Sequence, residues 1–158
     1  MSNQPPYGYP PPEGFPGGGF PPPSGPPQGK TQFLGLDFNL AALLCYVPGC
    51  CCLIDLIASV AWLATEPRSN RFLRFHALQG LLLFGVGVVI GIIFQILGLG
   101  AALTPTDVGR AGSGLLLLMV ELVVVLLLLV VHVIGMVKAY QGQTWKIPLI
   151  GDIADKNA

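Results

Sequence analysis

The sequence predicts an all-α fold, a polytopic integral membrane helical bundle of three transmembrane helices behind a disordered Pro/Gly-rich N-terminal tail. Three observations predict it. Only 10% of the 158 residues are charged and 53% are hydrophobic, whereas a soluble domain carries about 25% charged residues. Three long apolar runs follow one another, and prolines and glycines are concentrated before the first run. Eight basic residues balance eight acidic ones, which leaves no excess of positive charge for nucleic-acid binding.

The N-terminal tail comprises residues 1–34. Its first 29 residues contain eleven of the fifteen prolines and seven of the 21 glycines. Proline lacks an amide donor and glycine loses much entropy on ordering, so we expect disorder with local polyproline II character. The segment Pro23–Pro26 is a minimal PxxP motif that could bind an SH3- or WW-like groove. Such matches are common in proline-rich stretches, and a solvated extension is the favoured interpretation.

The tail is followed by a predicted membrane domain. It covers residues 35–155, with apolar runs at 40–63, 77–103 and 114–137. About 20 apolar residues cross the ~30 Å hydrocarbon layer, so each run is long enough for a transmembrane helix. Pro48-Gly49 interrupts the first run, and a kink or a broken, re-entrant first half is the alternative there. The mixed apolar and polar residues of 141–155 predict a C-terminal segment along the membrane interface.

The basic residues predict an orientation. Three spans place the first loop and the C-terminus on one side, which then carries six Lys and Arg residues. The other side carries only Lys30 and Arg110. Basic loops stay in the cytoplasm, so we expect the first loop and the C-terminus to be cytoplasmic and the N-terminus to be external. No basic cluster followed by an early apolar run is present, and we expect no secretory signal peptide.

Ionisable residues inside the apolar runs are functional candidates, because each costs roughly 2.5–3.5 kcal/mol to insert. Asp55 lies in the first run, and Glu121 and His132 lie eleven residues apart in the third. On a helix, the last two share a face and are separated by ~16 Å. A proton or cation path through the three residues is one hypothesis. Polar contacts that hold helices together are the favoured alternative.

The second apolar run carries a stripe of small residues on one helical face. Its members are Gly80, Gly87, Gly91 and Gly98. Missing side chains let a neighbouring backbone approach closely, and the nearby Gln95 could form a hydrogen bond across such a contact. The stripe therefore predicts a helix-packing surface, either within the bundle or between copies of the chain.

The residues that flank the spans predict anchors at the membrane boundary. Arg71 and Arg74 share one helical face, so their guanidinium groups can meet lipid phosphates. The other anchor candidates are His76, Gln79, Trp145 and Lys146.

The cysteines do not predict a metal or redox site. Cys50, Cys51 and Cys52 are consecutive, so on a helix they point in three directions, and together with Cys45 they form no CxxC pair. No nucleophile–base motif, phosphate-binding loop or dinucleotide-binding motif is present. We therefore expect no metal, no cofactor and no enzymatic activity.

Four motifs resemble those of a known family. They are Leu36-Asp-Phe-Asn-Leu-Ala-Ala-Leu-Leu-Cys-Tyr46, Arg74-Phe-His-Ala-Leu-Gln79, Met136-Val-Lys-Ala-Tyr-Gln-Gly142 and Ile147-Pro-Leu-Ile-Gly-Asp-Ile-Ala154. Over roughly Gly35–Asp155 the chain resembles small prokaryotic membrane proteins of unknown function. That family is grouped with the import-channel subunit of the chloroplast inner-envelope translocon. The resemblance implies a multi-pass protein of a prokaryotic inner membrane and a distant link to protein translocation.

The sequence thus predicts a structural or accessory subunit of a membrane assembly, in contact with the lipid bilayer and with copies of itself or other membrane proteins. Three helices enclose little interior, so burial of both Asp55 and Glu121 favours a homo-oligomer or a larger complex. The alternative is a small channel or transporter with a polar path through Asp55, Glu121 and His132. No nucleic-acid partner is expected.

Overall fold

The computed structural model describes residues 29–48 and 53–158. Within these ranges the chain is helical, and its β-structure is limited to one isolated bridge between Lys30 and Asp37. The helices are α1 (Phe38–Leu44), α2 (Ile54–Thr65), α3 (Arg71–Ala102), α4 (Asp107–Tyr140) and α5 (Ile150–Asn157). Most of the predicted tail lies outside the described residues. Its last residues belong to the folded body, where Thr31 is buried.

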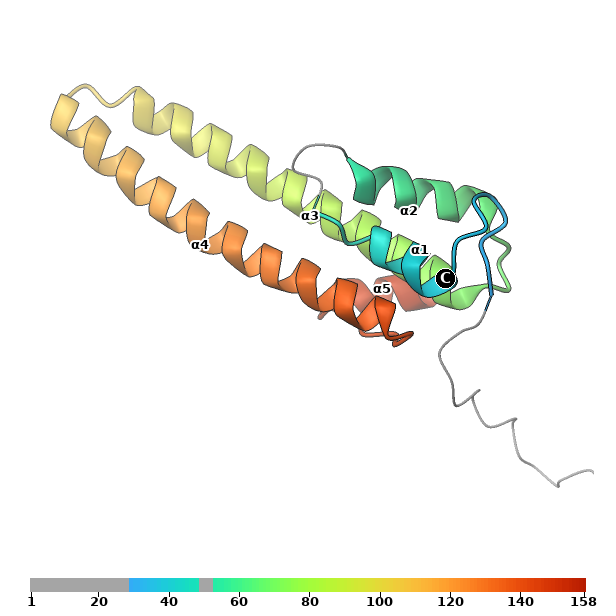
Figure 1. Cartoon of the computed structure of the whole chain (residues 1–158). Helices are drawn as coiled ribbons and strands as arrows, with labels where there is room; N and C mark the ends of the chain where they lie inside the picture. The colour runs from blue at the N-terminus through green and yellow to red at the C-terminus, as the bar shows by residue number, and fades with distance from the viewer. Residues whose placement is uncertain (1–28, 49–52) are drawn as a thin grey trace, which may run out of the picture.

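Helices α3 and α4 form a long antiparallel hairpin (Figure 1). Their 32 and 34 residues correspond to about 48 and 51 Å of helix, and both are long and apolar enough to cross a membrane. Each begins at a side-chain cap. The Asn70 Oδ1 atom accepts from the Leu73 amide at 3.3 Å, and the Thr106 Oγ1 atom accepts from the Gly109 amide at 3.2 Å. The hairpin therefore matches the second and third predicted runs.

The first predicted span is divided into two short helices. Helix α1 has seven residues and α2 has twelve, and neither reaches the ~20 residues that a continuous span needs. Pro48 lacks an amide donor, and Leu53 adopts a left-handed φ of 50° just before α2, so a single helix cannot continue through this region. The structure thus replaces the continuous span of residues 40–63 with the broken alternative.

Helices α1 and α2 lie along the same half of the α3–α4 hairpin, and α2 returns toward the end where α1 begins (Figure 1). The Trp62 indole N–H donates to the Ala41 carbonyl oxygen at 3.0 Å, which ties the two helices together. Because this pair returns to its starting end, the chain passes between the two ends of the molecule twice, along α3 and along α4. Among the described helices, α3 and α4 are thus the two long and apolar enough to cross a membrane, and the prediction of three transmembrane helices is not confirmed.

The segment before α1 and the C-terminal helix lie at the same end of the hairpin (Figure 1). The Gln32 amide donates to Glu66 Oε1 at 2.8 Å, which places the segment before α1 beside the α2–α3 connection. Arg71, at the start of α3, forms an ion pair with Asp155 of α5 at 3.6 Å. The first described residues and the C-terminal helix therefore lie at the same end of the hairpin, and the N-terminus itself lies outside the described residues.

The buried core is confined to this end of the molecule. Its largest fully buried side chains come from the turn that follows α1, from α2 and from the first turns of α3. They are Trp62, Tyr46, Leu73, His76, Gln79, Cys45 and Ser59. In contrast, none of the most apolar 18-residue stretch of α4 is buried, and only 11% of that of α3 is buried. The far half of the hairpin therefore exposes its apolar surface.

Candidate functional site

Three buried side chains form a hydrogen-bond network that we call the polar network: Tyr46, His76 and Gln79. The Gln79 Nε2 atom donates to the Tyr46 hydroxyl oxygen at 2.9 Å and to the Trp145 carbonyl oxygen at 3.0 Å. The Ile147 amide donates to Gln79 Oε1 at 3.3 Å. The network thereby joins the end of α1, the start of α3 and the segment that precedes α5.

The order of donors in the polar network favours one tautomer of His76. The Tyr46 oxygen lies 3.0 Å from His76 Nδ1. Because Gln79 already donates to this oxygen, the single tyrosine proton is available for His76 Nδ1. The proton of a neutral His76 is then on Nε2, a buried atom without a hydrogen-bond partner among the described residues. The His76 ring also packs edge-on against Phe72 and Phe75, with centroids 4.6 and 5.1 Å away, so an apolar shell surrounds the network.

Glycines on three helices allow the backbones around the polar network to meet. A Cβ atom at Gly80 of α3 would overlap the Cys45 carbonyl oxygen. At Gly135 of α4 it would lie 2.7 Å from the Tyr46 ring, and at Gly151 of α5 it would lie 2.9 Å from Gln79 Oε1. These three positions therefore need glycine for close approach. Among the residues of the predicted stripe, Gly80 is the one that packs in this way.

The predicted membrane-boundary anchors occupy different environments. His76 and Gln79 are 1% and 0% exposed, so they lie inside the protein. Arg74 is half-buried, and its Nη1 atom donates to the Leu63 and Glu66 carbonyl oxygens at 3.2 and 3.4 Å, at the end of α2. Arg71 remains exposed at the surface. Trp145 is half-buried, and its backbone carbonyl belongs to the polar network.

Lys146 lies on the surface and binds the C-terminal helix. Its Nζ atom donates to Asp155 Oδ2 at 2.7 Å and lies 3.7 Å from Asp152 Oδ1. The hydrogen bond with Asp155 raises the pKa of Lys146 and lowers the pKa of Asp155. The predicted interfacial segment 141–155 is therefore held against α3 by charged contacts outside and by Gln79 inside.

Asp55 and His132 line one cavity, which we call the Asp55–His132 cavity, with a volume of about 670 Å³ between α2, α3 and α4. Asp55 is 2% exposed, and its Oδ1 atom accepts from the adjacent Leu56 amide at 2.8 Å. The His132 Nδ1 atom lies 2.8 Å from the Leu128 carbonyl oxygen. Since a carbonyl only accepts, His132 carries a proton on Nδ1.

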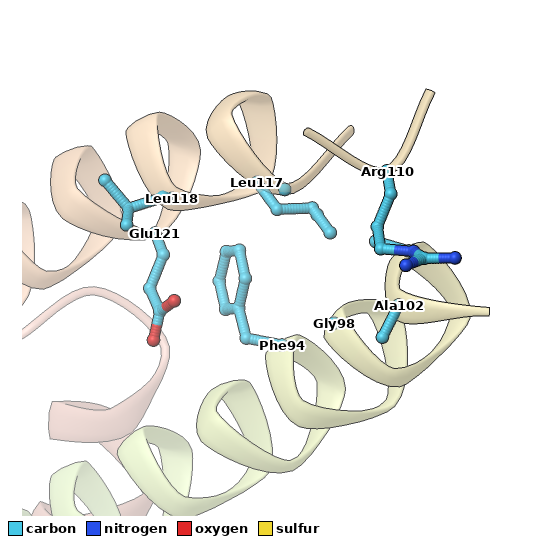
Figure 2. Close-up of a pocket in the computed structure, with 9 residues that line it drawn as sticks. Phe94, Gly98, Ala102, Arg110, Leu117, Leu118 and Glu121 are labelled. Atoms are coloured by element: carbon cyan, nitrogen blue, oxygen red, sulfur yellow. The ribbon is translucent and has the colours of Figure 1, made fainter. Parts of the chain in front are cut away.

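Glu121 lines a second cavity of about 350 Å³, toward the other end of the hairpin. Figure 2 shows its carboxylate beside the Phe94 ring in the space between α3 and α4, with Arg110 near the connection between them. Arg110 pairs with Asp107 at 3.6 Å. The structure therefore divides the three ionisable candidates, because it brings Asp55 and His132 to one cavity and Glu121 to another.

The remaining members of the glycine stripe face open space. A Cβ atom at Gly87, Gly91 or Gly98 would meet no atom within 4 Å. Gln95 is exposed on the same helix. These positions thus leave room for a further side chain, in contrast to Gly80, and Gly87 and Gly98 line the Asp55–His132 cavity and the Glu121 cavity, respectively.

The cysteine-rich segment is only partly described. Cys45 is a free, buried thiol, and Cys50, Cys51 and Cys52 lie outside the described residues. In the ranges 29–48 and 53–158, no group of three or more His, Cys, Asp and Glu side chains is arranged to hold a metal ion.

Tyr46 is the functional candidate that sequence reasoning missed. Tyrosine at the end of an apolar segment carries no distinctive spacing, and its two partners lie at least 30 residues away. The available signal was the set of four motifs. One motif ends at Tyr46, another contains His76 and Gln79, and a third begins at Ile147, so the polar network joins residues from three of them.

The described residues form a helical body with two helices long and apolar enough to cross a membrane, and the relatives that the chain matches are membrane proteins. Residues 37–154 match the magnetosome magnetite crystal formation protein family, and the chain belongs to that family. It is 35% identical over 128 residues to UPF0132 membrane protein MJ1443 of Methanocaldococcus jannaschii. The aligned residues cover 81% of this chain and 94% of that protein.

A second relative from the same archaeon, UPF0132 membrane protein MJ1527, is 31% identical over 127 residues, or 80% of this chain and 74% of that protein. No solved structure matches the chain. The chain is thus a member of a small membrane protein family of uncharacterised function, as the resemblance implied. The comparisons do not show the grouping with the chloroplast import channel.

Proposed function

We propose that the protein is a non-catalytic assembly subunit of a membrane, which associates with further copies of itself through the far half of its α3–α4 hairpin. The observation that carries the proposal is the open glycine surface of α3. A Cβ atom at Gly91 or Gly98 would meet no atom within 4 Å, and Gly98 lines the open Glu121 cavity between α3 and α4. Small residues in lipid favour close helix association. Gln95 and Glu121 are exposed near this surface, where polar groups gain from a protein partner rather than lipid.

The proposed orientation places both described ends in the cytoplasm, with α3 and α4 as the two spans. Seven of the eight basic residues lie at the core end of the hairpin, and only Arg110 lies at the other. Basic residues favour the cytoplasmic side. This arrangement keeps the first loop and the C-terminus cytoplasmic, as expected from the sequence, and adds the N-terminal segment to the same side.

The number of copies per complex tests the assembly proposal. The full chain is labelled with one fluorophore and extracted in lipid nanodiscs formed directly from the membrane. The fluorescence of single nanodiscs should then bleach in more than one step, because each step reports one copy of the chain. Gly91→Ile should lower the assembled fraction because it fills the open surface, whereas Val89→Ile, at a nearby exposed position, should leave it unchanged. A chain that bleaches in one step, or two variants that behave alike, would refute the proposal.

The link to protein translocation is supported by the resemblance alone. A pull-down of the tagged chain at native expression, with mass spectrometry, tests it. Co-purification of a secretion or insertion machine would support an accessory role in translocation, and a homo-oligomer without such partners would count against it.

A small channel or transporter is the second candidate, because Asp55 and His132 share a cavity. In proteoliposomes with an interior pH dye, Asp55→Asn should then abolish proton flux while the number of bleaching steps stays unchanged. Equal flux for the native chain and Asp55→Asn would remove this candidate.

A further inference from the structure

We propose that the Asp55–His132 cavity binds a lipophilic organic cation, an amine carried on an apolar body. The proposal does not depend on the assembly function, because it concerns Asp55 and His132 and not Gly91 and Gly98. It assigns a ligand-binding role to a carboxylate for which the fold provides no salt-bridge partner among the described residues.

The size and lining of the cavity fit a small apolar molecule. Its volume of about 670 Å³ lies within the ~300–1,000 Å³ of ordinary ligand pockets. Apart from Asp55 and His132, the lining side chains are apolar and include Phe84, Val88 and Val125. Val88 is 44% exposed, so the cavity opens toward the outer surface of α3, where an apolar ligand could enter from the lipid.

The Asp55 carboxylate is the charged group of the cavity. It is 2% exposed, its Oδ1 atom accepts from the Leu56 amide, and no Lys or Arg of the described residues forms a salt bridge with it. His132 uses its Nδ1 proton on the Leu128 carbonyl, so this proton is not offered to the cavity. A carboxylate in an apolar cavity selects a ligand that donates hydrogen bonds, and an ammonium group donates and carries the compensating charge.

Charge balance favours a cation over a neutral donor. A buried carboxylate without a counter-charge is costly, and the start of α2 and the Leu56 amide offset only part of that cost. The cavity also contains the ring of Phe84, and an aromatic face attracts a cation. An amine that lies between Asp55 and Phe84 would therefore satisfy both the charge and the apolar lining.

The proposal is tested by equilibrium dialysis of the full chain in dodecyl maltoside against 1-aminoadamantane. The dialysis is done at pH 7, where this amine is protonated. The native chain should bind it saturably, and adamantane-1-carboxylate, of matched size and opposite charge, should not bind. Asp55→Asn should raise the Kd of the amine more than about tenfold, in line with loss of a charge-assisted contact. Glu121→Gln removes the other intramembrane carboxylate and should leave the Kd unchanged.

A second variant keeps the test decisive if Asp55→Asn does not fold. Val88→Trp adds volume to the cavity rim at a partly exposed position and should abolish amine binding while its elution volume stays native. The proposal is overturned if the amine binds Asp55→Asn or Val88→Trp as well as the native chain, or if the carboxylate binds as tightly as the amine. Loss of binding in Glu121→Gln would also overturn it.

Discussion

Gly80→Ala should destabilise the core in which α1, α2 and α3 meet. A Cβ atom at this position would overlap the Cys45 carbonyl oxygen and would lie 3.0 Å from both Cys45 Cβ and Ser59 Oγ. The main obstacle is a backbone atom, which cannot rotate away, so α1 has to separate from α3. Overpacking of this kind costs about 1–3 kcal/mol, whereas alanine recovers only about 0.8–1 kcal/mol of helix propensity relative to glycine.

Gly85→Ala is the matched control in the same helix, because a Cβ atom there meets nothing within 4 Å. The propensity gain is common to both variants, so the difference between their free energies of unfolding isolates the packing cost, about 1–3 kcal/mol. Titration of the detergent-solubilised protein with SDS, followed by tryptophan fluorescence, measures it. If the two variants unfold within ~0.5 kcal/mol of each other, which is usual for surface substitutions, then α1 does not pack on α3 as described.

Three further predictions concern the polar network, the C-terminal helix and the topology. Gln79→Leu removes the hydrogen-bond partner of the Tyr46 hydroxyl, the Trp145 carbonyl and the Ile147 amide. It should lower the free energy of unfolding by about 2–4 kcal/mol. Gln95→Leu is the exposed control, and a smaller loss for Gln79→Leu than for this control would contradict the prediction. The lowered pKa of Asp155 means that its pairing stabilises α5 above the unfolded-state pKa and is lost as the pH falls through the folded-state value. The protection factors of the α5 amides, which correct for the slower intrinsic exchange in acid, should therefore fall with the pH, and Asp155→Asn should remove that response. In a cysteine-free background, a membrane-impermeant thiol reagent added to intact cells should label a cysteine at Asp107 and not one at Phe33; equal labelling of the two would exclude a shared cytoplasmic end for the described termini.

The sequence determined the helical class and the two long helices of this protein. The runs 77–103 and 114–137 lack strong helix breakers, so hydropathy and length alone predict α3 and α4. The same criterion does not predict that the run 40–63 forms two short helices, α1 and α2, because hydropathy does not register the left-handed backbone at Leu53. With α2 folded back along α1, the described segment before α1 lies beside the α2–α3 connection, which counting apolar runs does not predict.

Only the tertiary structure decided which members of each pattern act together. Gly80 and Gly91 belong to one helical stripe, but α1 ends opposite Gly80, and nothing in the chain lies opposite Gly91. The sequence predicts that Gln79 lies at the membrane boundary. In the structure it is buried in the core, where it contacts Tyr46, 33 positions earlier, and Ile147, 68 positions later. Periodicity relates residues on one helix, and these contacts depend on where other helices end, which is a property of the packed chain and not of any one segment.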